Sequence, residues 1–216
     1  MFNIIDLFLN IDSNIGLLID SFGPWSYIVI LAIIFCETGL VFLPFLPGDS
    51  LLFLVGAFAG KGSLDIFVLF FILSFAAIAG DSVNYAFGRY LGEKVFLKKG
   101  LLKRKHLDKA KNFYAKYGGK AIIIARFVPI IRTIAPFVAG MGEMEYSKFL
   151  GYNIIGGVFW VGLFVFAGYF FGSIPFVQEN LTIVLAVVVV LSLVPILIEI
   201  IKYKMKKRLP NKLTQK

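Results

Sequence analysis

The sequence contains few of the residue types that most enzymes and metal-binding proteins use for catalysis and metal binding. It has one cysteine, Cys36, and one histidine, His106, so it can form no intramolecular disulfide and offers no usual zinc ligand set. His106 lies in a strongly basic stretch, so no Ser-His-Asp triad can be assembled around buried residues. Charged residues make up only 16% of the chain, against about a quarter in ordinary soluble domains. We therefore expect no metal and no cofactor, and we predict that the protein is not an enzyme.

The chain contains long apolar runs and few charged residues. The chain of 216 residues is 59% hydrophobic and includes 24 Phe. Three stretches approach the ~20 apolar residues that a helix needs to cross the hydrocarbon core of a bilayer. They lie at about 64–92, 147–172 and 180–201. The sequence therefore predicts an all-α integral membrane protein whose last transmembrane helix, 180–201, stands apart from the core.

The first segment, residues 1–22, has a different pattern. Apolar side chains such as Ile4, Phe8 and Ile11 follow one helical stripe, and polar side chains lie on the opposite face. This pattern predicts an amphipathic helix that lies at the membrane interface. The segment lacks the basic region and the small-residue cleavage site of a signal peptide.

Positive charge is concentrated in two segments, and no basic residue precedes Lys61. The segment 89–120 contains eleven Lys or Arg against two acids, and the tail 202–216 contains seven Lys or Arg and no acid. Because both segments flank apolar helices, the positive-inside rule explains them better than a nucleic-acid surface does. We therefore place both in the cytoplasm and expect no nucleic-acid partner. Residues 105–117 carry apolar side chains on one face and predict a second surface helix.

The cytoplasmic position of these segments decides how residues 121–142 are inserted. By parity with the C-terminal helix, helix 147–172 starts inside, and the loop 89–120 is inside too. The apolar segment 121–142 lies between them, so it must enter and leave by the cytoplasmic face as a re-entrant hairpin. Pro129 and Pro136 are the expected helix breakers, since each removes a helix hydrogen bond and clashes with the preceding turn.

Residues 25–60 show a similar interruption. Pro44, Pro47 and Gly48 separate two apolar arms, and the second arm is too short to span the membrane. Since the following long helix ends inside, the residues before it lie outside. The segment 25–60 is therefore predicted to be a hairpin that dips in from the outside. A full crossing by residues 25–46 is the alternative.

Each half of the core, residues 23–175, thus consists of a hairpin followed by a long helix, and the two halves enter from opposite faces. This arrangement predicts an inverted-topology repeat, visible as P-x-x-P-G in the first half against P-x-x-R-x-x-x-P-x-x-A-G in the second. In secondary transporters, broken helices of this kind meet near the midplane and aim their ends at charged groups. Irregular backbone is tolerated at that depth only where it lines a cavity or packs within protein.

Five charged residues fall within or beside these apolar segments, where a charge costs from ~2.5 to over ~10 kcal/mol depending on the measurement. They are Glu37, Asp49, Asp81, Arg126 and Arg132. One interpretation is a set of ion pairs that only fixes the hairpins to each other. Buried ion pairs stabilise poorly relative to apolar packing, however. The other interpretation is a binding site for an anion.

The spacing of the two arginines favours an anion site. Arg126 and Arg132 are six residues apart, so on a continuous helix they would point about 120° from each other. With a proline between them, both guanidiniums can converge on one anion, and a phosphate suits their bidentate geometry. Asp81, Asn84 and Asn153 are candidates for supporting polar contacts. The glycines on the same helix faces are expected to be close-packing positions; they are Gly88, Gly92, Gly156 and Gly157.

Three stretches of the chain resemble the DedA family of bacterial membrane proteins, whose core is shared with the eukaryotic VTT-domain lipid scramblases. They are "ETGLVFLPFLPGDSLLFLVGAFAG", "GDSVNYAFGRYLG" and "RFVPIIRTIAPFVAGMGEMEYSKFLGYNIIGGVFW". The resemblance covers roughly residues 20–175, and both the acidic and the arginine positions stand where the family has them. It implies two facing re-entrant hairpins in a bacterial plasma (inner) membrane. It also implies that Glu37 and Asp49 are essential acids and that Arg126 and Arg132 are essential arginines.

The resemblance implies lipid translocation driven by the proton gradient. We expect a flippase of an anionic lipid carrier, undecaprenyl phosphate or a phospholipid, that supports the recycling of envelope lipids. Glu37 or Asp49 would take up a proton outside and release it inside. The choice between H⁺ and Na⁺ and the presence of a homo-oligomer stay open. Two alternatives also stay open: an uncoupled scramblase of phosphatidylethanolamine, and a lipid-pyrophosphate phosphatase, which lacks a nucleophile that can be placed.

Overall fold

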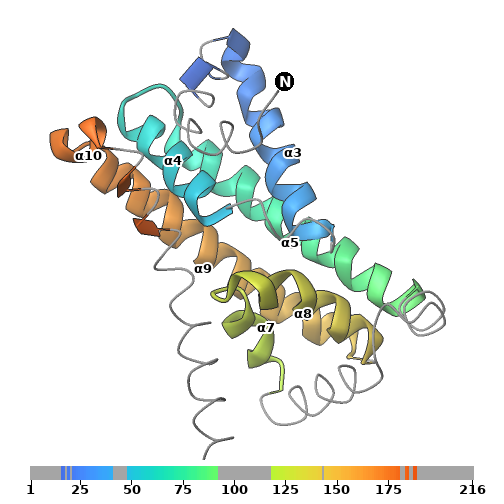
Figure 1. The fold of residues 1–216 in the computed structure, drawn as a ribbon. Coiled ribbons are helices and arrows are strands. Elements are labelled where there is room, and N and C mark those ends of the chain that lie inside the picture. Colours follow the sequence, from blue (N-terminus) through green and yellow to red (C-terminus); the bar gives the residue numbers. More distant parts are fainter. Residues whose placement is uncertain are drawn as a thin grey trace, which may run out of the picture.

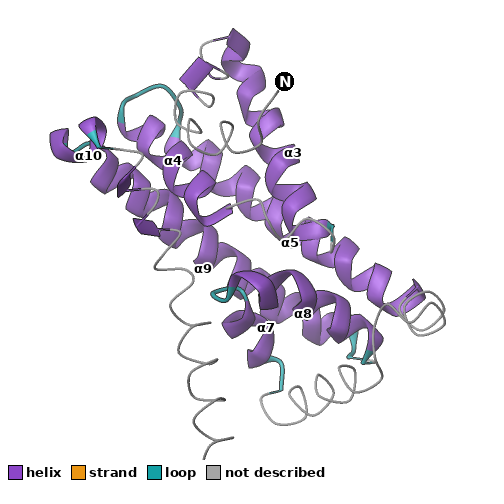
Figure 2. Cartoon of the chain, viewed as in Figure 1, coloured by secondary structure: helices purple, strands orange, loops and turns teal. Residues whose placement is uncertain are grey.

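The described part of the chain is entirely helical. The structure, a computed structural model, describes residues 16–17, 19, 21–40, 48–91, 118–142, 144–180, 183–184 and 187–188. Among these residues there is no strand (Figure 2). The helices are η1 (Gly23–Trp25), α3 (Ser26–Gly39), α4 (Gly48–Gly60), α5 (Ile66–Leu91), α7 (Lys120–Ala125), α8 (Pro129–Met141), α9 (Tyr146–Gly172) and α10 (Pro175–Glu179). The all-α prediction is confirmed for this part of the chain.

Several predicted elements lie wholly or mostly outside the described residues. They are the interfacial helix 1–22, the surface helix 105–117, the C-terminal helix 180–201 and the basic tail 202–216. Pro44 and Pro47 of the first predicted break also lie outside them.

Two helices, α5 and α9, are long and apolar enough to cross a membrane. They have 26 and 27 residues, which corresponds to about 40 Å at 1.5 Å per residue. The start of α5 is capped by Asp65, whose Oδ1 accepts hydrogen bonds from the backbone N–H groups of Phe67 and Val68 at 2.8 and 2.9 Å. Both helices begin and end within two residues of the bounds predicted from the sequence. They lie beside each other through the length of the molecule (Figure 1).

The other core helices are short and come in two pairs. The pair α3 and α4 has 14 and 13 residues, and the pair α7 and α8 has 6 and 13. Each of the 13- and 14-residue helices is about 20 Å long, too short for a hydrocarbon core of about 30 Å. Within the second pair the helix is interrupted at residues 126–128, and Pro129 is the first residue of α8. Proline suits that position, because the first helical N–H has no intrahelical partner.

The prediction that Pro136 would break the chain is wrong. Pro136 lies inside α8, which continues to Met141. A proline inside a helix removes one backbone hydrogen bond and strains the preceding turn, but packing can hold the helix together. Here α8 is pressed against α5 on one side, so the helix persists beyond the proline. The segment from α7 to α8 therefore has one helix break, at residues 126–128.

The short helices are exchanged between the two halves of the core. α4 packs along α9, and α8 packs along α5, so each lies against the long helix of the other half. The first contact depends on two glycines, because a Cβ at Gly56 would overlap the carbonyl of Val165 and one at Gly168 would overlap the carbonyl of Phe53. Without side chains at these positions, the two backbones approach closely.

The contact between α5 and α8 is built in the same way. A Cβ at Gly88 would overlap the carbonyl of Phe137, and one at Gly140 would overlap the carbonyl of Tyr85. The short helices thus share a Phe-x-x-Gly spacing, Phe53 to Gly56 in α4 and Phe137 to Gly140 in α8. The packing supports an internal repeat, and it confirms the prediction that Gly88 is a close-packing position.

Candidate functional site

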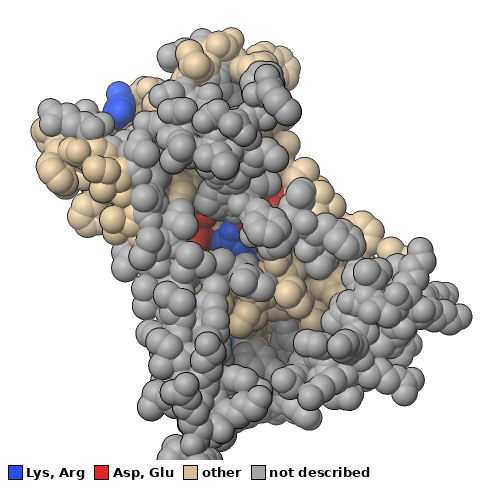
Figure 3. Space-filling model, in the orientation of Figure 1, with Lys and Arg blue, Asp and Glu red and all other residues tan. Residues whose placement is uncertain are grey.

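The five charged residues that the sequence singled out are all buried, and the helix breaks bring them together. They are Glu37 on α3, Asp49 on α4, Asp81 on α5, Arg126 just after α7 and Arg132 on α8. Their exposed fractions are 1%, 8%, 4%, 4% and 8%. Figure 3 shows acidic and basic atoms side by side near the middle of the molecule. Five separate segments therefore contribute to one buried group of charges.

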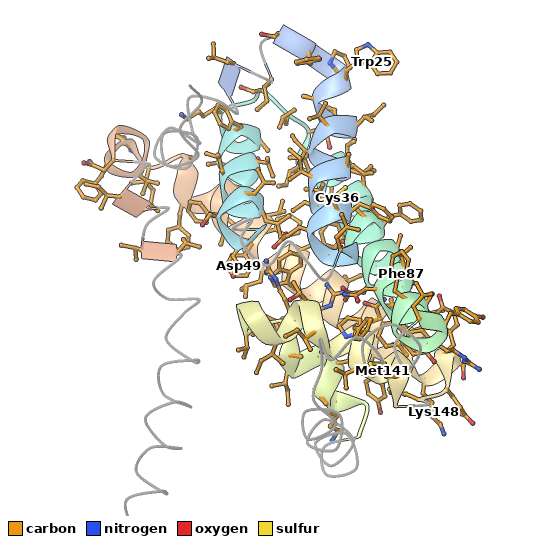
Figure 4. All side chains as sticks on the ribbon, turned by 45° about the vertical axis from the view of Figure 1, so that its right-hand side comes forward. Trp25, Cys36, Asp49, Phe87, Met141 and Lys148 are labelled. Atoms are coloured by element: carbon orange, nitrogen blue, oxygen red, sulfur yellow. The ribbon has the colours of Figure 1, made fainter. Side chains whose placement is uncertain are left out.

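Arg132 is held by two carboxylates from the other half of the core. Its Nη1 donates to Oδ1 of Asp49 at 2.5 Å, and its Nη2 donates to Oε1 of Glu37. In Figure 4 Asp49 lies at the end of α4 that faces α8. The two outer nitrogens of one guanidinium are thus occupied by two different acids, which are the strongest acceptors that a protein offers.

Glu37 is placed by the start of α4 as well as by Arg132. The backbone N–H of Gly48, the first residue of α4, donates to Oε1 of Glu37 at 3.3 Å. A Cβ at Gly48 would overlap the carboxyl group, so any other residue at this position would require the Glu37 side chain to shift. The positive end of the α4 dipole and the unpaired N–H groups of its first turn favour a negative charge at this point. Glu37 therefore occupies an anion position at the end of a helix.

Arg126 belongs to a second group of contacts. Its Nη2 donates to Oδ2 of Asp81 and to Oδ1 of Asn153, both at 2.5 Å, and lies 3.5 Å from the carbonyl of Ala77. Asn153 in turn donates through Nδ2 to the carbonyl of Ile78 at 2.9 Å. Arg126 thus joins α7 to both long helices, and the two arginines do not share a carboxylate.

Gly156 and Gly157 lie against the side chain of Arg126, a contact that the sequence did not predict. A Cβ at Gly156 would come within 3.1 Å of Cδ of Arg126, and one at Gly157 within 3.3 Å of its Nη2. We expected both glycines to be close-packing positions between helices. That prediction is confirmed, because a Cβ at Gly156 would come within 3.3 Å of Cα of Ile123 and one at Gly157 within 3.0 Å of Cγ1 of Ile78. In addition, both glycines leave room on α9 for the guanidinium side chain of Arg126. The sequence gives no direct sign of this, because a glycine on a helix face looks the same in either role.

Trp160 is the site residue that sequence reasoning missed. Its side chain is buried, and its ring lies under both arginines, with Cζ of Arg132 4.8 Å and Cζ of Arg126 5.9 Å from the ring centroid. Its Nε1 donates to Oδ1 of Asp49 at 2.9 Å. A buried indole needs a partner for its N–H, and its face attracts cations. Trp160 follows Asn153 by seven residues, which places both on one face of α9 and was the available signal.

Asn84 links the two broken segments by hydrogen bonds to their backbones. Its Nδ2 donates to the carbonyl of Thr38 at 3.2 Å and to the carbonyl of Thr133 at 2.7 Å. Thr38 follows Glu37, and Thr133 follows Arg132. One buried amide on α5 therefore fixes the backbone beside an acid of the first half and an arginine of the second.

The group of buried charges is not balanced. Three carboxylates face two guanidiniums, which leaves a net charge of −1 if all five are ionised. Oε2 of Glu37 and Nε of both arginines have no hydrogen-bond partner among the described residues. In that part of the chain no set of three or more His, Cys, Asp or Glu side chains could hold a metal ion. One proton or one monovalent cation would neutralise the group.

Comparison with known proteins shows the family to which the chain belongs. The family model described as VTT domain matches residues 46–170. The protein DedA of Escherichia coli K12 is 51% identical over 205 residues, which cover 93% of this chain and 94% of that protein. The inner membrane protein YqjA of the same organism is 35% identical over 151 residues, or 69% of each chain. An uncharacterized membrane protein of Mycobacterium leprae, ML0287, is 43% identical over 170 residues, 78% of this chain and 76% of that protein. No solved structure matches.

Proposed function

We propose a lipid-translocating function for this chain, which belongs to the DedA family of VTT-domain membrane proteins. The substrate is the phosphate head group of an anionic lipid carrier, with undecaprenyl phosphate as the first candidate. Movement is coupled to the proton gradient across a bacterial plasma membrane and serves the recycling of envelope lipids. YqjA, a relative, is named an inner membrane protein, which supports this location.

One observation carries the proposal: two guanidiniums are buried at the meeting point of helix breaks in a chain with membrane-spanning helices. An anionic head group that crosses an apolar slab needs a position where its charge is matched. Guanidiniums bind phosphate in bidentate fashion and are less strongly hydrated than ammonium groups. Arg126 and Arg132 would therefore bind the phosphate, and the ring of Trp160 would support both.

The acids have a separate role in the proposal. Glu37 and Asp49 exchange protons with the two sides of the membrane, because a buried carboxyl group can exist as a charged acceptor or as a neutral donor. Asp81, Asn84 and Asn153 support the arginines and the breaks. A substrate site formed at broken helices near the midplane is the arrangement that many secondary transporters use.

The proposal includes a membrane topology that would allow the lipid to move from one face to the other. Residues 25–60 form a hairpin that enters from the outside, and residues 121–142 form one that enters from the cytoplasm. The loop 89–120 and the C-terminal tail lie in the cytoplasm. Alternate opening of the two hairpins would expose the arginines first to one face and then to the other. The exchanged packing of α4 on α9 and of α8 on α5 supports this symmetry.

The test is lipid flipping by the purified full chain in proteoliposomes. Undecaprenyl phosphate should move faster than phosphatidylethanolamine, and a pH gradient should increase the rate, whereas a Na⁺ gradient should not. Equal rates for both lipids without any gradient would instead identify an uncoupled scramblase. Release of phosphate from undecaprenyl pyrophosphate would identify a phosphatase. Either of these results would overturn the proposal, as would the absence of flipping in every condition.

A further inference from the structure

The position of Glu37 is one that a phosphate oxygen would suit. Its Oε1 accepts hydrogen bonds from Nη2 of Arg132 and from the backbone N–H of Gly48 at the start of α4. A guanidinium together with a helix N-terminus is a combination that binds phosphate groups well. The glutamate side chain therefore fills an anion site that belongs to α4 and α8 together.

The second outer nitrogen of Arg132 is also occupied. Nη1 donates to Oδ1 of Asp49, so a phosphate cannot bind the guanidinium in bidentate fashion unless at least one carboxylate withdraws. A phosphate brought beside two ionised carboxylates in a buried site would meet strong repulsion, since Coulomb energies rise as the dielectric falls. Protonation removes both obstacles, because a neutral carboxyl group holds a guanidinium weakly and does not repel an anion.

We infer that Glu37 and Asp49 compete with the lipid phosphate for Arg132, so that protonation of these acids and phosphate binding favour each other. The inference rests on the proposed function and specifies its coupling. Each carboxylate takes up one proton and leaves the guanidinium, and a phosphate oxygen takes its place. On release the phosphate leaves, the proton dissociates and the ion pair forms again. Proton and lipid phosphate therefore travel in the same direction.

The charge count supports this exchange. The empty group carries −1 when its five members are ionised. A dianionic phosphate that enters with two protons leaves that total unchanged. A monoanionic phosphate leaves it unchanged when it enters with one proton. The buried group would then never hold a large net charge, which keeps its electrostatic cost low in an apolar setting.

The ionisable groups around Arg132 are few in the described part of the chain. They are Glu37 from α3, Asp49 from α4, Asp81 from α5 and Arg126 after α7, whereas α9 contributes only Trp160 and Asn153, which do not titrate. Asp81 differs from the other two acids because its ion pair is with Arg126. Because the proposed function also assigns Arg126 to the phosphate, Asp81 belongs to the binding site and is not a control. The control for the loss of a carboxylate is Glu145→Gln, since the ion pair of Glu145 with Lys148 is exposed.

The experiment measures binding of farnesyl phosphate and farnesyl sulfonate to the full chain in nanodiscs over a series of pH values. The sulfonate is included because a phosphate monoester titrates itself, near pH 6, whereas a sulfonate keeps one charge. Affinity of the wild type for the sulfonate should rise as the pH falls, by up to about tenfold per pH unit for one linked proton. Glu37→Gln and Asp49→Asn should bind at high pH as tightly as the wild type does at low pH, with a flatter profile. Glu145→Gln should keep the wild-type profile.

The outcomes separate this inference from the function on which it rests. Binding of both probes that is independent of pH, or that weakens as the pH falls, would overturn the competition and leave translocation standing. Amide variants that bind more weakly with an unchanged profile would do the same. No binding of either probe at any pH would overturn both. If a variant fails to fold, the pH profile of the wild type still decides.

Discussion

The indole N–H of Trp160 donates a hydrogen bond to Oδ1 of Asp49, and the same oxygen accepts a second hydrogen bond from Nη1 of Arg132. Asp49 and Trp160 are 111 residues apart in the sequence, so this contact joins α4 of the first half to α9 of the second. The acid is therefore positioned by three helices, its own, α8 and α9. A change on α9 should affect how the acid and Arg132 interact.

Trp160→Phe tests this relationship. The variant keeps an aromatic ring under the arginines but removes the N–H that Asp49 accepts. A hydrogen bond to a charged group contributes about 1.5–3 kcal/mol, so we expect a lower thermal stability and a several-fold slower flipping rate. Trp25→Phe is the control, because Trp25 is 68% exposed and should tolerate the change. Equal stability and equal flipping of both variants would show that the indole N–H is unimportant.

Gly48→Ala tests the approach of Glu37 to the start of α4. The added Cβ would overlap the carboxyl group of Glu37, so that side chain must move away from Arg132. We expect flipping to fall at least tenfold while the helical content seen by circular dichroism stays the same. Gly151→Ala is the control, because a Cβ at Gly151 meets no atom within 4 Å. A fully active Gly48→Ala protein would contradict the placement of Glu37.

Arg132→Lys separates phosphate binding from charge balance. Lysine keeps the positive charge but lacks the planar fork whose two outer nitrogens reach Glu37 and Asp49. Loss of one charge-assisted hydrogen bond should weaken lipid phosphate binding by roughly ten- to a hundred-fold. The measurement is farnesyl phosphate binding at matched expression. Near-normal binding by the lysine variant would mean that Arg132 serves only to balance charge.

The pairing of Arg126 with Asp81 predicts a rescue of folding. Arg126→Gln alone leaves a buried carboxylate without its partner, which should cost about 3–5 kcal/mol of stability. The double variant Arg126→Gln with Asp81→Asn should recover most of that loss, measured by thermal unfolding in detergent. Arg126→Gln combined with Glu37→Gln should not, because Glu37 pairs with Arg132. Recovery of flipping in the first double variant would show that Arg126 does not bind the lipid phosphate.

Thiol labelling tests the orientation in the membrane. In a Cys36→Ala background, cysteines at Ser63 and at position 178 should react with an impermeant reagent added to intact cells. Cysteines at positions 103 and 211 should react only after the cells are opened. Labelling of position 103 from outside would reverse the orientation and remove the argument for a cytoplasmic hairpin at 121–142.

Much of the fold could be predicted because it depends on local properties of the chain. Hydropathy over 20 or more residues predicted α5 and α9 within two residues, since a helix is the element that satisfies its own backbone hydrogen bonds in lipid. Pro129 predicted the break before α8, because proline is tolerated in the first turn of a helix but disfavours helical backbone at the residue before it. The high cost of a charge in an apolar segment singled out Glu37, Asp49 and the two arginines.

The tertiary structure decided which of these charges meet and what surrounds them. Arg132 pairs with two acids that are 95 and 83 residues away, and Arg126 pairs with one that is 45 residues away. No local pattern distinguishes these pairings from the others that three acids and two arginines allow. They follow from the exchange of α4 and α8 between the halves, which depends on close backbone contacts at glycines of separate helices. The same long-range packing lets α8 continue through Pro136, sets the ring of Trp160 under both guanidiniums, and gives Gly156 and Gly157 their role beside Arg126.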